Sequence, residues 1–411
     1  MHTLLHEKDR IRDFDLTLRN PLAQTGTVWA TIPGPDLPAT QRILRLRRTD
    51  PGGIFAVTEQ LVGPAREWCA LGDNVIGVTG WLGISLEDQY RAVRTGAGAF
   101  IASAMYYLRI SGRNAGIVLD MISPRVISDL PVGSARFTLF TTPAGTVDEE
   151  AVIVRTGDHD FEMSCGGGKS PGWLAAVSER FDDVTITDSD VFSFNIKGPL
   201  RLAAVQSLMS QGDAGKIAGL RNFTFCRTSP LTGGTARVLK TVIGYEVWAE
   251  QDVLSETWRQ LVTDRPAIVP CAWDLLTTYR MECTDILFSL YPVDVHSGTT
   301  LWDVGCGWMV RGDDEHEFVG RKSLLESRHN DRLWFAGLRA EDTVAPPVTG
   351  REVVDEGGEF IGYVTSAAVS PVHGRTVGFA HLLPRVVPGQ RVTVDGHDWT
   401  TCTLPIAHPA G

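Results

Sequence analysis

The sequence has no apolar run close to the roughly 20 residues that a membrane-spanning helix requires. The longest candidate, Gly96 to Leu108, is shorter and is flanked by Arg94 and Arg109. The N-terminal residues MHTLLHEKDRIRDFD carry acidic side chains early and lack the apolar centre of a signal peptide. We therefore expect no membrane partner and a cytoplasmic location.

Metal-binding and disulfide patterns are also missing. The 7 cysteines form no CxxC pair, and the 10 histidines form neither an HExxH motif nor a cluster with cysteines. An odd number of scattered thiols is typical of a reducing compartment rather than of a disulfide framework or a zinc site. We expect no metal ion.

Basic residues are fewer than acidic ones. The chain has 38 Lys and Arg residues against 49 Asp and Glu residues, which gives a formal net charge of -11. This balance argues against nucleic acid or an anionic membrane as a general partner. A small anionic ligand is still compatible with it, because a few local arginines can override the overall field.

The phosphate-binding and hydrolase motifs are incomplete. The segment CGGGKS, from Cys165 to Ser170, resembles the end of a P-loop, but Met163 occupies the position of the first glycine. Gly96-Ala97-Gly98 lacks the third glycine of a dinucleotide-binding fingerprint, and no GxSxG motif is present. The first segment is better explained as a glycine-rich turn before a helix.

What remains is a long chain of ordinary globular composition. Its 411 residues, 43% hydrophobic and 21% charged, predict two or three cores. The first 75 or so residues show little regular pattern and are interpreted as an arm or extension, and clearer patterns begin at Ser85. After Arg332, short β-like runs separated by Pro346-Pro347 and Gly357-Gly358 predict a separate antiparallel β domain.

Helix and strand patterns alternate between these two segments. Ser85 with Asp88 forms a capping-box-like start for a helix through Arg94. The runs Ala135 to Thr141 and Ala151 to Arg155 predict a hairpin. Further helices are expected at about Arg113 to Ile122, from Ser170, from Gly198, and around Val253 to Val262 and Ala272 to Glu282.

The predicted hairpin carries three consecutive acids, Asp148, Glu149 and Glu150, at its mouth. Like charges repel one another, so partial burial would raise the pKa of at least one of them. Such a group is a candidate for proton transfer. The structural alternative is a solvated acidic turn.

A second acid interrupts an apolar strand. In Ile243 to Trp248, Glu246 stands between Tyr245 and Val247, and in a strand it points to the same side as Trp248 and away from Tyr245. A buried carboxylate requires hydrogen-bond donors, so this position is a candidate binding site. The alternative is a solvent-facing glutamate on an edge strand.

These segments and their surroundings resemble the T-protein (aminomethyltransferase) family of the glycine cleavage system, which includes tetrahydrofolate-dependent demethylases. The resemblance covers roughly residues 80 to 400, and seven pieces occur in the order of the family. They are Ala92 to Phe100 with Met105, Phe137 through Glu149-Glu150, Gly198-Pro199, Gly244-Tyr245-Glu246, Arg280-Met281-Glu282 with Tyr291 and Asp294, Gly305 to Trp308 with Phe318 to Arg321, and Gly362 to Ser366 with Ser370-Pro371.

The resemblance implies an α+β fold of three lobes in a cloverleaf, with a C-terminal antiparallel β-barrel domain. The implied boundaries are an N-terminal extension packing on the core (residues 1–78), a folate-binding core of two interleaved α+β lobes (79–330) and the barrel (331–411). Tetrahydrofolate is the implied cofactor, held in the central channel.

The resemblance also implies the site residues. Glu246 corresponds to the carboxylate that binds the pterin, since a carboxylate can accept two parallel hydrogen bonds from an amino-pyrimidine edge. Tyr245 and Trp248 on the same strand, with Phe137, Met105 and Arg280, are the other candidate cofactor-binding residues. Phe137 and Met105 could equally be core. Arg280, a candidate for the anionic tail of folate, could instead pair with Glu282 or another acid.

Glu150 aligns best with the catalytic aspartate of the family, with Glu149 beside it as a second candidate. Three departures point to the demethylase branch: the longer acid at Glu150, Lys240 to Ile243 in place of a segment rich in Thr, Gly and Glu, and a longer stretch between Asp274 and Arg280 than in the glycine-cleavage enzymes. Trp248 stands where several demethylases have a catalytic tyrosine, and an indole N–H is not a useful acid. Another proton donor would then be needed, with Glu150, Tyr106, Tyr107 or water as the candidates.

The function expected from this resemblance is methyl transfer from a small methoxy, methylamino or methylsulfonio donor to N5 of tetrahydrofolate. A small-molecule methyl donor is then the partner, and no carrier protein is expected. One alternative is an aminomethyltransferase that takes its carbon from a lipoylated carrier protein. Another is a folate-binding accessory protein without turnover.

Overall fold

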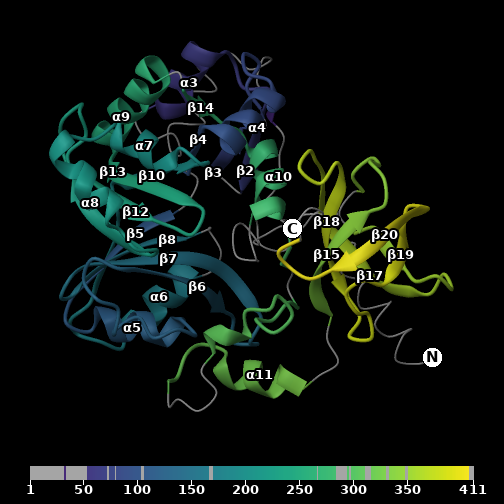
Figure 1. The fold of residues 1–411 in the computed structure, drawn as a ribbon. Coiled ribbons are helices and arrows are strands. Elements are labelled where there is room, and N and C mark those ends of the chain that lie inside the picture. The colour runs from purple at the N-terminus through teal and green to yellow at the C-terminus, as the bar shows by residue number, and fades with distance from the viewer. Residues whose placement is uncertain are drawn as a thin grey trace.

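Figure 1 shows the computed structural model of the chain, in which three lobes surround a common centre. Two α+β lobes lie one above the other on the left of the view, and a β-barrel lies on the right. The residues that the structure describes are 32–33, 53–71, 74–78, 80–102, 106–165, 170–265, 267–283, 294–295, 298–310, 316–329, 333–347 and 350–406. No helix among them is long and apolar enough to span a membrane.

The first lobe is built on a six-stranded sheet of order β11-β12-β13-β10-β4-β14. Its pairings are antiparallel except that of β14 with β4, which is parallel. The strands are β4 (Ala97–Ile101), β10 (Val191–Lys197), β11 (Thr224–Thr228), β12 (Ala236–Lys240), β13 (Gly244–Glu250) and β14 (Ile268–Pro270). The helices of this part are α4 (Leu86–Thr95), α7 (Arg201–Gln206), α8 (Ala214–Ala218), α9 (Gln251–Asp264) and α10 (Trp273–Cys283).

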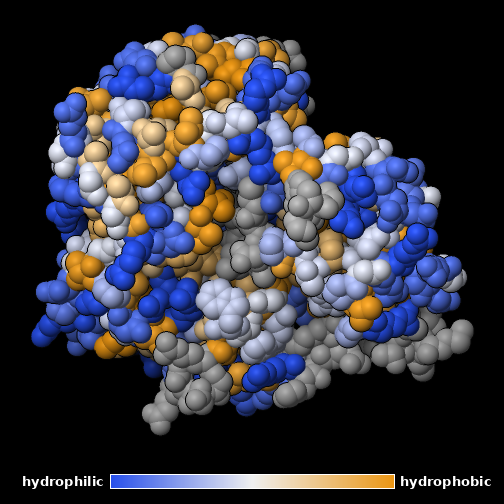
Figure 2. Space-filling model, in the orientation of Figure 1, coloured by the Kyte–Doolittle hydropathy of each residue, from blue (hydrophilic) through white to orange (hydrophobic). Residues whose placement is uncertain are grey.

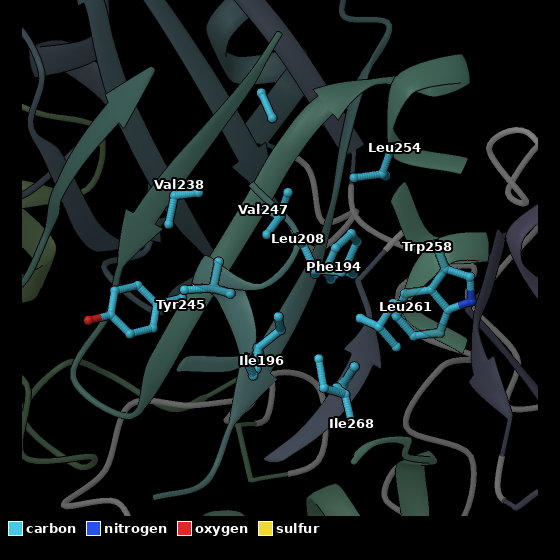
Figure 3. Close-up of a cluster of buried hydrophobic side chains, with 14 of the residues drawn as sticks. Phe194, Ile196, Leu208, Val238, Tyr245, Val247, Leu254, Trp258, Leu261 and Ile268 are labelled. Carbon is cyan, nitrogen blue, oxygen red and sulfur yellow. The ribbon is translucent and has the colours of Figure 1, made fainter. Parts of the chain in front are cut away.

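One face of this sheet is an apolar core, shown in Figure 3. Phe194 and Ile196 from β10 and Val247 from β13 alternate with side chains that point to the other face, so this core takes up only one side of each strand. Trp258 and Leu261 from α9 cover them. The opposite face is free to carry polar residues, and the candidate site lies there.

The second lobe is a five-stranded sheet of order β6-β7-β8-β5-β9. It consists of β5 (Tyr106–Ser111), β6 (Ala135–Thr141), β7 (Val147–Gly157), β8 (Asp160–Cys165) and β9 (Thr185–Asp188), with α5 (Ala115–Ile122) and α6 (Ser170–Ser178). Residues of both helices pack with Ala151 and Ile153 of β7 in one cluster. The helices therefore cover one face of this sheet and leave the other face for contact with the first lobe.

The third lobe is a closed barrel of order β15-β18-β17-β16-β19-β20, in which neighbouring strands are antiparallel. The strands are β15 (Trp334–Ala340), β16 (Glu352–Val354), β17 (Phe360–Ser370), β18 (Arg375–Leu382), β19 (Arg391–Val394) and β20 (His397–Cys402). Helix α11 (Arg321–Glu326) precedes it. The antiparallel β domain predicted after Arg332 is confirmed, as is the α+β class with three lobes.

The segment before Ser85 is more regular than its sequence indicated. It contains helix α3 (Ile54–Val62) and strands β1 (Ile32–Pro33), β2 (Glu67–Leu71) and β3 (Asn74–Val78). Ile54 and Val57 join the core of the first lobe, and Trp258 Nε1 of α9 donates a hydrogen bond of 2.7 Å to Thr58 Oγ1. The helix was missed because its nine residues gain their stability from this tertiary packing rather than from local pattern.

Several local predictions are confirmed. Helix α4 is capped by Ser85, whose Oγ accepts from the Asp88 backbone N–H at 3.0 Å. Strand β6 has the predicted bounds, and α5, α9 and α10 lie within two residues of the predicted starts. The second strand of the hairpin is longer than predicted, since β7 begins at Val147 rather than Ala151.

Candidate site at the meeting point of the lobes

The polar face of the first sheet meets the uncovered face of the second sheet. Tyr107, Ala135 and Val154 of the second lobe pack with Leu239 and Trp248 of the first in one buried cluster. Figure 2 shows the molecular surface hollowed next to this junction, between the two left lobes and the barrel. Residues on these facing sheets are therefore placed to line a common site.

An ion pair fixes the two sheets to one another. The two terminal nitrogens of Arg237, on β12, donate to the carboxylate oxygens of Glu162, on β8: Nη1 to Oε1 at 2.8 Å, and Nη2 to Oε2. The pair is mostly buried, at 14% and 13% side-chain exposure. A planar fork of this kind defines orientation as well as distance, so it sets how the two walls of the site face each other.

Glu246 lies on an interior strand and is 7% exposed. Its strand, β13, pairs with β12 on one side and β10 on the other, and Glu246 stands opposite Leu239 and Asn195. The alternative of a solvent-facing glutamate on an edge strand is therefore wrong. The carboxylate belongs to the face that is turned away from the apolar core of Figure 3.

Trp248 orients this carboxylate. Its indole Nε1–H donates a hydrogen bond of 2.9 Å to Glu246 Oε2. Burial raises the pKa of Glu246, while the hydrogen bond from Trp248 and the positive charge of Lys197 act in the opposite direction. One oxygen of the carboxylate is thus held by the protein. Trp248 orients Glu246 through this hydrogen bond and does not act as an acid.

Tyr245 does not share this site, which corrects its assignment as a cofactor-binding residue. Successive side chains of a strand point to opposite faces, and Tyr245 packs in the apolar cluster with Val247 and Val238. Figure 3 shows its ring on that side of the sheet. It is 3% exposed and belongs to the core of the first lobe.

The three acids of the hairpin are not in a turn. Asp148, Glu149 and Glu150 all lie within β7, and Asp148 and Glu149 are 7% and 0% exposed. The alternative of a solvated acidic turn is therefore wrong. The turn lies before these acids. It contains Gly145, which has a positive φ of 78°, and β7 begins two residues later, at Val147.

Glu149 and Glu150 point to different faces of the second sheet. Glu149 stands opposite Phe140, which packs in the cluster under α5 and α6. Glu150 stands opposite Leu139, and Val152, two residues further, packs against the cluster that contains Trp248. Only Glu150 is therefore on the face that is turned towards the first lobe.

The charge of Glu150 affects the thiol of Cys306. Burial and the negative charge of Glu150 together raise the pKa of Cys306 to about 12. Cys306 and Leu139 belong to the cluster that joins the second lobe to the barrel, and Phe137 packs against it while half-buried. Glu150 and Phe137 thus lie where the lobes converge.

Tyr107 is a buried phenol at the same junction. Its hydroxyl donates to the carbonyl oxygen of Ala102 at 2.9 Å and lies 2.9 Å from Ser193 Oγ. Burial and the negative charge of Glu246 raise its pKa, so it is a poor acid at neutral pH. The side chain of Tyr106, like Met105, lies outside the described residues.

Arg280 forms a buried ion pair with an acid, which was the structural alternative to binding the anionic tail of folate. Its Nη1 donates to Asp294 Oδ2 at 2.6 Å and its Nη2 to Ser366 Oγ at 2.7 Å, and it is 3% exposed. The partner is Asp294 and not Glu282, which pairs with Arg94. Arg280 thereby ties α10 to strand β17 of the barrel.

Replacing Arg280 with Met should lower the free energy of unfolding by about 3–5 kcal/mol, because Asp294 would remain buried without its counter-ion. Chemical denaturation of both proteins measures the difference. Arg109→Met is the matched control, since the Arg109–Asp160 pair is 59% and 39% exposed. That variant should lose less than about 1 kcal/mol. Equal losses of unfolding free energy in the two variants would show that the buried Arg280–Asp294 pair stabilises the fold no more than an exposed pair does.

Strand β10 contributes three polar residues that the sequence had not singled out. Ser193, Asn195 and Lys197 are 2%, 8% and 1% exposed and lie on the same face as Glu246. The signal was their alternation with Phe194 and Ile196. It is a weak signal, because such alternation is typical of any strand with one buried face.

The fold has a counterpart among solved structures. The aminomethyltransferase T of the glycine cleavage system from Bartonella henselae superimposes with a TM-score of 0.72 over 86% of this chain and 97% of that one, at 18% identity. At this identity the likeness establishes the fold alone: a T-protein-like arrangement of three lobes.

The sequence matches are more specific. Residues 82–314 match the GCVT N-terminal domain, and residues 335–406 match the glycine cleavage T-protein C-terminal barrel domain. The chain therefore belongs to the glycine cleavage T-protein family. A relative from Streptomyces avermitilis, named aminomethyltransferase, is 28% identical over 72% of this chain and 81% of its own length. Another from Bacillus subtilis, also named aminomethyltransferase, is 25% identical over 72% of this chain and 82% of its own length.

Proposed function

We propose that this protein is a tetrahydrofolate-dependent one-carbon transferase in which Glu246 binds the pterin ring of tetrahydrofolate. Family membership supports the reaction class, and the relatives are named aminomethyltransferase. The observation that carries the residue assignment is a carboxylate 7% exposed on an interior strand, oriented by Trp248 and facing the second lobe. A fold has no need of a buried acid at this position, since an apolar residue would be less costly there.

The residues around Glu246 fit a pterin. A carboxylate can accept two parallel hydrogen bonds from an amino group and a ring N–H of a pyrimidine edge. Trp248 fixes the plane of the carboxylate through one oxygen, and each oxygen can accept more than one hydrogen bond. Aromatic neighbours, Tyr107 and Phe100, border the same face.

Tetrahydrofolate supplies the nitrogen nucleophile that accepts the one-carbon unit. Glu150, from the opposite wall, would stabilise positive charge that develops on that nitrogen or accept the proton it loses. Holding donor and acceptor between two fixed sheets would supply much of the remaining rate enhancement, since positioning alone can contribute several kcal/mol.

For the donor, the relatives favour an aminomethyl group over a methyl ether. The relatives from Streptomyces avermitilis, Bacillus subtilis and Chlorobium luteolum, which match 72% to 79% of this chain, are named aminomethyltransferase. Methyl transfer from a small methylated compound is the second candidate. It rests on Glu150, one methylene longer than the catalytic aspartate with which it aligns.

Mass analysis of the folate product tests the proposal. The purified protein is incubated with tetrahydrofolate and either an aminomethylated lipoyl carrier protein or a panel of methylated small molecules. Methylene-tetrahydrofolate formed only with the carrier supports the aminomethyltransferase, and methyl-tetrahydrofolate supports the demethylase. Folate binding without any product supports a non-catalytic accessory protein. If calorimetry detects no folate binding, the proposal is wrong.

A further inference from the structure

Lys197 is a deeply buried charged side chain on the face of Glu246. It ends β10, and its side chain is only 1% exposed. Lysine is almost never fully buried unless it is paired, because removing an ammonium from water is costly. Its burial on an interior strand therefore requires interactions that compensate for the loss of water around the ammonium group.

Two glycines flank this lysine in the sheet. The residues that pair with Lys197 on either side are Gly98 on β4 and Gly244 on β13. A Cβ at Gly244 would clash with the Ile196 carbonyl oxygen and stand 3.4 Å from Lys197 Cγ, so the backbone packs closely beside the lysine. The ammonium lies 5.8 Å from the centroid of the Phe100 ring, within the range of a cation–π interaction.

Glu246 is the diagonal neighbour of this lysine. It pairs directly with Asn195, and Lys197 is the next residue of β10 on the same face. Diagonal neighbours across strands are within reach of long side chains. The positive charge of Lys197 acts on the carboxylate and favours its ionised form, against the effect of burial.

Most of the other described charged groups near this face form ion pairs. Arg94 of α4 pairs with Glu282 and Arg280 of α10 pairs with Asp294. Arg237 of β12 pairs with Glu162 of the facing lobe, which also contributes the acid Glu150 and Tyr107, whose pKa is raised by burial. Among the described residues, Lys197 is the cation whose charge lowers the pKa of Glu246.

We infer that Lys197 is a positioning residue for pterin binding: its ammonium keeps the buried carboxylate of Glu246 charged and in place. This inference rests on the proposed function, in which Glu246 accepts hydrogen bonds from the pterin. An ionised carboxylate accepts these bonds at both oxygens, whereas a protonated one presents a donor and loses the match. Lys197 would thus act through Glu246 and not through contact with the ligand.

The pH dependence of folate binding tests this role. A carboxyl loses its charge as the pH falls through its pKa, so binding weakens at low pH. Removing an adjacent cation raises the pKa of an acid by about 1–3 units. In Lys197→Met and Lys197→Gln, the pH at half-maximal affinity for tetrahydrofolate should therefore rise by about one unit or more. Anaerobic titration calorimetry across pH measures it, and thermal unfolding identifies any variant that fails to fold.

Two further variants separate this role from packing. Lys197→Arg keeps the charge and should restore the profile of the original protein. In Glu246→Gln, which has no charge to hold, adding Lys197→Gln should leave the pH profile unchanged. If the original protein binds folate and the neutral variants keep its pH profile, the inference is wrong while the proposed function stands. If the original protein binds no folate, the proposed function itself fails.

Discussion

Replacing Glu246 with Gln should weaken tetrahydrofolate binding by at least about 100-fold. The substitution preserves shape but removes the charge from an acceptor of two hydrogen bonds, each worth about 1.5–3 kcal/mol when one partner is ionised. It also places an amide N–H₂ where an acceptor is needed. Titration calorimetry at neutral pH measures the change in Kd.

Glu250→Gln is the matched control for this variant. Glu250 ends the same strand, β13, but is exposed. Its substitution removes the same charge from the chain without touching the buried site, so the affinity should stay within about twofold. Similar losses for both variants would show that net charge, and not the buried carboxylate, governs binding.

Replacing Glu150 with Gln should lower turnover by about 10²–10⁴-fold and leave folate affinity nearly unchanged. Proton transfer or charge stabilisation by a positioned side chain contributes on this scale. Glu150 lies on the face of β7 that is turned towards the first lobe, which is the face available to a bound ligand. Single-turnover kinetics at saturating tetrahydrofolate, alongside calorimetry, separates the chemical step from binding.

Glu149→Gln distinguishes the two neighbouring acids. Glu149 is fully buried on the opposite face, under α5 and α6. Its substitution should change thermal stability more than turnover. If Glu149→Gln abolished turnover and Glu150→Gln did not, the assignment of the catalytic acid to Glu150 would be reversed.

Local chemistry made several elements readable in the sequence. The cap formed by Ser85 and Asp88 identified the start of α4, and alternating side chains identified β6 and β13. The side of Glu246 relative to Tyr245 and Trp248 also followed from the two-residue period of a strand. Helix α3 was not readable, because its stability comes from contacts with α9, about 200 residues later.

The sequence by itself determined the family, the alternation of helices and strands, and the identity of Glu246 and Glu150 as candidate acids. Those properties depend on residue types and short spacings. Tertiary structure alone decided that Glu246 is on an interior strand, that Glu150 and not Glu149 faces the first lobe, and that Arg280 is committed to Asp294. Burial and charge pairing depend on which distant strands become neighbours, and no local pattern in one chain encodes that.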